Sequence, residues 1–104
     1  MNYEPKPINT DRVVLPPEVE NLVEKLARNT HEIWSKTRLD QGWTWGPERD
    51  DAGKRHPCIT PYENLSEAER DVDRNTAAGV LKTILALGYK IEPARETDNP
   101  QGES

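Results

Sequence analysis

Residues 17–42 read PEVENLVEKLARNTHEIWSKTRLDQG, and the apolar residues of this stretch recur at steps of three and four. Because an α-helix turns once every 3.6 residues, such spacing places the apolar side chains on one face. Pro17 suits a first helical turn, and Gly42 can adopt the left-handed backbone that ends a helix. The stretch therefore predicts an amphipathic helix over about residues 17–40.

A second helix is predicted over about residues 67–87. Ser66 followed by Glu69 forms a capping box, the apolar stripe continues to Leu87, and Gly88 follows as a terminator. We expect short strands between and around the helices. They are placed near residues 13–15, 43–45, 58–60 and 89–91. The predicted fold class is mainly α, with two antiparallel helices and short β-strands.

The chain has 104 residues, which is the length of one compact domain. We expect a single domain over residues 1–92 that begins with an extended, proline-containing arm. Residues 93–104 are polar and are expected to form a disordered tail.

Charge and composition exclude several classes of function. The net charge is −5 and the pI is about 5.0, so binding to a nucleic acid polymer is not expected. A small anion could still be held by a few arginines. A single cysteine, Cys58, excludes an internal disulfide. No apolar run is long enough to cross a membrane, and the first residues do not read as a signal peptide, so we expect a cytoplasmic protein without membrane association.

His31 and Trp34 lie three residues apart and therefore share a helix face. Two interpretations are open. The indole could close the core beside a hydrogen-bonded histidine. Alternatively, an exposed indole could stack on a flat ligand, with Arg38 one turn further along to meet the charge of that ligand.

Metal binding and catalysis are poorly supported by the sequence. His31, His56 and Cys58 have suitable side chains for zinc but no recognised spacing. Cys58 could act as a nucleophile with a histidine base, but its setting after Pro57 favours a buried structural thiol. Most carboxylates fall on predicted solvated helix faces. We therefore expect no metal, no cofactor and no enzymatic activity.

Four segments, taken in order, carry a resemblance to a known family. They are LARNTHEIW at residues 26–34, QGWTWGP at 41–47, HPC at 56–58 and TILALGY at 83–89. Together they resemble the RyR repeat of ryanodine receptors, over about residues 3–92. The resemblance implies two main antiparallel helices with short strands at one end, and a family without known catalytic activity.

The resemblance also implies a ligand. One tandem pair of receptor repeats binds an adenine nucleotide between its two repeats, and the Trp at the position of Trp34 stacks on that ligand. The positions of this chain that match the site are His31, Trp34, Arg38, Arg49 and His56.

This chain holds one repeat, so a cleft of the tandem type would require two copies. We expect a homodimer, because the apolar stripe of the second helix widens near its end, at Val80, Leu81, Ile84 and Leu85. The alternative is a module for protein–protein interaction without a small-molecule ligand.

Overall fold

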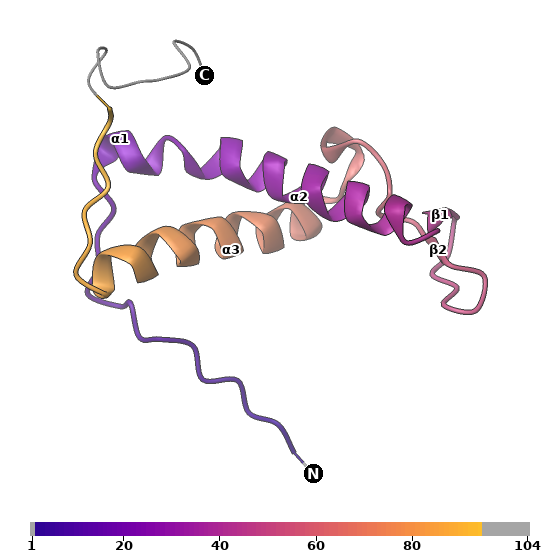
Figure 1. Ribbon diagram of the computed structural model, residues 1–104, viewed down its shortest axis with the longest axis horizontal. Coiled ribbons are helices and arrows are strands. Elements are labelled where there is room, and N and C mark those ends of the chain that lie inside the picture. The colour runs from indigo at the N-terminus through magenta and orange to yellow at the C-terminus, as the bar shows by residue number, and fades with distance from the viewer. Residues whose placement is uncertain (1, 95–104) are drawn as a thin grey trace.

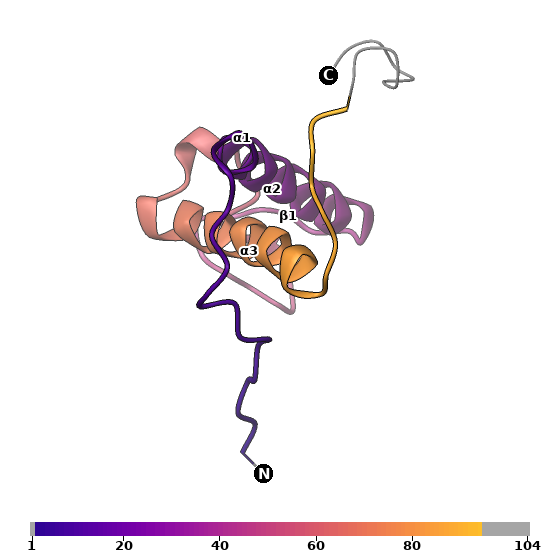
Figure 2. The ribbon, with the colours of Figure 1, turned by 90° about the vertical axis from the view of Figure 1, so that its left-hand side faces the viewer.

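A computed structural model describes residues 2–94 as a hairpin of two long helices with small elements at both ends. Helices α2 and α3 lie side by side and run antiparallel (Figures 1 and 2). This confirms the predicted class, mainly α with two antiparallel helices. In chain order the elements are α1 (Pro17–Glu20), α2 (Val23–Asp40), β1 (Thr44–Trp45), β2 (Arg55–His56), the 3₁₀ helix η1 (Tyr62–Asn64) and α3 (Glu67–Ala86).

The first predicted helix is interrupted near its beginning. Asn21 and Leu22 form a turn between α1 and α2, and the Leu22 N–H donates to the Val19 carbonyl, three residues back. This is the tighter bonding of a 3₁₀ turn rather than of an α-helix. Asn21 is a weak helix former, which is consistent with a break at this point.

The predicted ends of the helices are confirmed. Ser66 Oγ accepts from the Glu69 N–H, and the Glu69 carboxylate accepts from the Ser66 N–H at 2.9 Å, which completes the capping box of α3. Gly42 and Gly88 follow the helices with φ of 93° and 95°. Both angles lie in the left-handed region that a side chain disfavours, so these glycines end the helices as expected.

Most of the predicted strands are wrong. Residues 13–15, 58–60 and 89–91 are not strands, whereas β1 lies within the predicted segment 43–45. Its parallel partner β2 was not predicted. In the loop after β2, backbone N–H groups bond to nearby carbonyls rather than to a neighbouring strand: the Thr60 N–H donates to the Cys58 carbonyl and the Ile59 N–H to the His56 carbonyl.

Two small hydrophobic clusters hold the hairpin together. In the first, Leu15 and Val19 pack against Leu81 of α3, with Val23, Leu85 and Ile91 at its border. In the second, fully buried Ala27 of α2 contacts Tyr62 and Leu65. The Tyr62 hydroxyl donates to Glu24 at 3.0 Å, so the one polar atom of this buried ring has a partner. This second cluster anchors the loop that forms one wall of the cavity described below.

The arm before the first helix, described from residue 2 onward, has no regular secondary structure. Residues 2–10 contain no helix or strand; the beginning of the chain extends away from the helices in Figure 1, whereas Pro7, Ile8 and Thr10 border α3. The tail expected over residues 93–104 falls, from residue 95 onward, outside the described residues.

Within residues 2–94, neither long helix has an apolar stretch sufficient to cross a bilayer.

Candidate functional site

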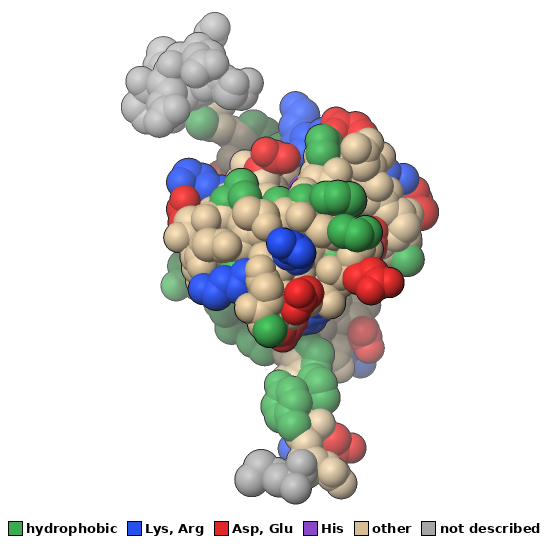
Figure 3. Space-filling view, turned by 90° about the vertical axis from the view of Figure 1, so that its right-hand side faces the viewer, with side chains coloured by type: hydrophobic (Ala, Val, Ile, Leu, Met, Phe, Trp, Pro, Cys, Tyr) green, Lys and Arg blue, Asp and Glu red, His purple; other side chains and the backbone are tan. Residues whose placement is uncertain are grey.

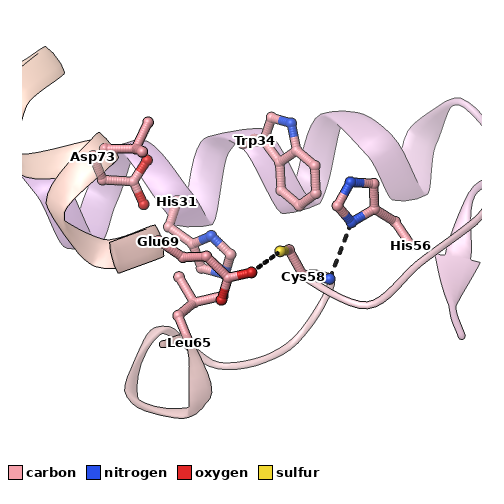
Figure 4. A pocket seen from close by; sticks show the side chains of 8 residues that line it. His31, Trp34, His56, Cys58, Leu65, Glu69 and Asp73 are labelled. Atoms are coloured by element: carbon pink, nitrogen blue, oxygen red, sulfur yellow. Dashed lines mark hydrogen bonds between the residues drawn. The ribbon is translucent and has the colours of Figure 1, made fainter. Parts of the chain in front are cut away.

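A cavity of about 300 Å³ lies between α2, the loop after β2 and the first turns of α3 (Figure 4). This volume is at the lower end of the range for small-molecule sites. All of its walls come from one chain. The lining residues are His31, Trp34, His56, Cys58, Leu65, Glu69, Val72 and Asp73.

His31 is buried and fixes the position of the loop relative to α2. Its Nε2–H donates to the Thr60 carbonyl at 2.7 Å, and Ser35 Oγ lies 3.4 Å from the same nitrogen. Only 3% of the residue is exposed. The ring of His31 therefore forms part of the cavity wall, while its hydrogen bond to Thr60 holds the loop against α2.

Trp34 is the central aromatic residue of the cavity and is half-buried. Its ring stacks on His31 with centroids 5.8 Å apart, and it meets the ring of His56 edge-on at 5.0 Å. The guanidinium carbon of Arg38 lies 5.7 Å from the centroid of Trp34 and also 5.7 Å from that of Trp43. The indole is thus held by neighbours on several sides while part of it faces the cavity.

His56 has a defined protonation pattern. Its Nδ1 accepts from the Cys58 N–H at 3.0 Å, so this nitrogen carries no proton and Nε2 carries the proton of the neutral ring. Burial lowers the pKa of His56, and the positive charges of Arg49 and Arg38 lower it further. His56 is therefore a neutral donor at pH 7.

The two predicted arginines differ in their relation to the cavity. Arg38 lies over Trp34 and donates to Gln41 at 2.7 Å. Arg49 is exposed, forms an ion pair with Asp51 at 2.8 Å, and does not line the cavity. Of the five predicted site residues, the structure brings His31, Trp34 and His56 together in the cavity and places Arg38 beside them.

Figure 3 views the end of the molecule that carries β1 and β2, where charges of both signs surround small apolar patches.

The wall formed by α3 was missed by the sequence analysis. Glu69 and Asp73 are four residues apart, and this spacing places both carboxylates on one helix face. Val72 on α3 and Leu65, which precedes the helix in an extended conformation, complete the wall. The four-residue spacing of the two carboxylates is visible in the sequence. It does not place them at the cavity, because the sequence does not show which face of α3 meets the loop.

The surroundings of Cys58 argue against a nucleophile. Its thiol donates to Glu69 Oε2 at 3.2 Å, and burial together with the Glu69 carboxylate raises the pKa of Cys58 to about 11. A thiolate, which is the reactive form, is therefore disfavoured. Within residues 2–94, no three His, Cys, Asp or Glu side chains are grouped as metal ligands would be.

Alkylation tests this assignment of Cys58. Raising the thiol pKa from 9.0 to about 11 leaves roughly one hundredth of the thiolate at pH 8. Iodoacetamide should therefore modify the folded chain about a hundredfold more slowly than the same chain in urea, as followed by mass spectrometry. Equal rates in the two states would contradict a thiol held protonated by Glu69.

The fold is a small helical hairpin with a cavity between α2, the loop after β2 and the start of α3. The sequence model of the RyR domain family matches residues 3–93, which is nearly all of the described chain. The chain belongs to the RyR domain family, as the four segments in the sequence indicated. Membership supports a general role as a binding or assembly module.

Proposed function

We propose that this protein is a non-catalytic binding module whose cavity takes a flat, anionic small molecule of the adenine nucleotide class. One observation carries the proposal: part of the Trp34 indole faces a cavity, with Arg38 over its ring and His56 at its edge. An aromatic wall with a nearby guanidinium suits a ring that bears a negatively charged group.

The charges around the cavity suggest how such a ligand would be oriented. Asp73 and His56 lie on opposite sides of Trp34 in Figure 4, and the arginines act on the His56 side. No Arg or Lys is among the residues that line the cavity. The ring would therefore lie against Trp34, and the phosphate would extend past His56 toward Arg38. This arrangement uses the cavity of one chain, and it does not require a second copy.

Thermal denaturation with AMP tests the proposal. A ligand at a hundred times its dissociation constant adds about 2.7 kcal/mol to the free energy of unfolding. In a domain of this size that gain raises Tm by roughly 10 °C or more. Failure of AMP, ADP and ATP at millimolar concentration to shift Tm would contradict the proposal.

The two arginines provide a matched comparison. Arg38→Ala should weaken AMP binding about tenfold, and the loss should shrink at high salt because charge recognition is screened. Arg49→Ala should weaken binding less, because Arg49 is already paired with Asp51. Equal effects of the two changes, measured by calorimetry at low and high salt, would contradict the proposed position of the phosphate.

A second candidate function is assembly with another copy of the chain, and it rests on one face of α3. Val80 is 56% exposed there, although it belongs to the apolar stripe. A groove of about 410 Å³ runs beside it, lined by Pro7, Ile8, Thr10, Asn75, Thr76, Gly79, Val80, Thr83 and Ile84. Leu81 and Leu85, which were expected to contribute to a dimer, instead pack in the core of their own chain. A homodimer would therefore use Val80 and its neighbours, without Leu81.

A further inference from the structure

The carboxylate of Asp73 stands out among the groups that line the cavity. It lies in the second turn of α3 and is partly withdrawn from water (Figure 4). Within residues 2–94, no side chain or backbone group forms a hydrogen bond or an ion pair with it, and its oxygens remain accessible to solvent. Partial burial raises the pKa of Asp73. The carboxylate therefore has capacity to accept hydrogen bonds from a bound molecule.

The neighbouring charged groups are engaged elsewhere. Glu69, one turn earlier, uses one oxygen to accept from the Ser66 N–H and the other to accept from the Cys58 thiol. Arg70 and Arg74 follow Glu69 in sequence but form ion pairs with Glu67 on another side of α3. Neither arginine therefore neutralises Asp73.

The groups that face Asp73 do not satisfy it either. His31 across the cavity uses its Nε2–H for the Thr60 carbonyl. The Cys58 thiol, also near Asp73, uses its proton for Glu69. Asp73 is thus an acceptor that neither His31 nor Cys58 satisfies.

We infer that Asp73 determines the specificity of the cavity, by selecting flat rings that present N–H donors toward α3. This inference rests on the proposed function and names the chemistry of the ligand edge opposite the phosphate. A ring with an amino group there donates to Asp73. A ring that carries only hydrogen at the same place has nothing to donate and leaves the carboxylate without a partner.

The test compares two nucleotides that differ at one ring position. AMP carries a 6-amino group where purine riboside 5′-monophosphate carries only hydrogen, and their ring nitrogens, sugar and phosphate are identical. Calorimetry on the full chain should show AMP binding about 10–100-fold more tightly than purine riboside 5′-monophosphate, the ratio expected for one hydrogen bond to a charged acceptor. Asp73→Asn should reduce this ratio to about threefold or less, because a neutral amide oxygen is a weaker acceptor than a carboxylate.

Asp71→Asn is the matched control, because Asp71 lies on the same helix, outside the cavity, and pairs with Arg74. It should keep the wild-type preference for AMP. Comparable binding of AMP and purine riboside 5′-monophosphate by the wild-type chain would overturn the role of Asp73 while leaving the proposed function intact. An unchanged ratio in Asp73→Asn would do the same. Binding of neither nucleotide would overturn the proposed function, and this inference with it.

Discussion

Leu81→Asp should abolish folding of this domain. Leu81 is 7% exposed and joins α3 to Leu15 and Val19 in one of the two hydrophobic clusters. Removing a buried leucine side chain costs about 2–5 kcal/mol, and an unpaired carboxylate in the same place adds several more. The total approaches the roughly 5–15 kcal/mol that stabilises a typical domain. Circular dichroism should therefore show loss of the helical signal in the absence of denaturant.

Val80→Asp is the matched control, since it makes the same chemical change at the adjacent residue. Val80 is 56% exposed, so its replacement should leave the helical signal in place and change the free energy of unfolding by about 1 kcal/mol or less. A cooperative urea transition for Leu81→Asp with the wild-type midpoint would contradict the assignment of Leu81 to the core.

The same variant tests assembly. If two copies associate through the exposed face of α3, sedimentation should show a wild-type dimer at micromolar concentration and a Val80→Asp monomer. A new charge at the centre of an apolar contact is costly without a partner. A wild-type chain that sediments as a monomer would remove the proposed homodimer.

The helices could be predicted from sequence because their signals are local. The apolar spacing, the Ser66 capping box and the two terminal glycines each act within a few residues, and the structure places the ends of α2 and α3 accordingly. The strands carry no such signal. β1 and β2 are two residues each, too short for an alternating pattern, and β2 contains charged Arg55 and polar His56 rather than apolar residues, so the strand was predicted three residues later, at 58–60.

The site was predicted on one side only, for a physical reason. His31 and Trp34 share a face of α2, and that face was identified by spacing. The opposite wall, with Glu69 and Asp73, depends on how α3 is rotated against the loop after β2. That rotation is set by burial of α3 residues such as Leu81, which packs against Leu15 and Val19 in a distant part of the sequence. Local patterns do not contain this information.

The cavity makes Trp34→Ala the most informative binding variant. Stacking of an aromatic side chain on a base contributes about 1–3 kcal/mol, so AMP affinity should fall roughly 5–150-fold. The fold should survive, because Trp34 is half-buried and truncation should cost less than the roughly 3–5 kcal/mol of a fully buried aromatic residue. Calorimetry with AMP and urea denaturation of the same sample measure the two effects separately.

Trp45→Ala is the control for this prediction, because it removes an indole that is 56% exposed on β1 and outside the cavity. It should bind AMP as the wild type does. If Trp34→Ala instead unfolds the chain, the indole acts mainly as core, as the first of the two sequence interpretations held. If Trp34→Ala stays folded and binds AMP with wild-type affinity, the ligand does not stack on Trp34. The cavity would then lose the aromatic contact on which the proposed function depends.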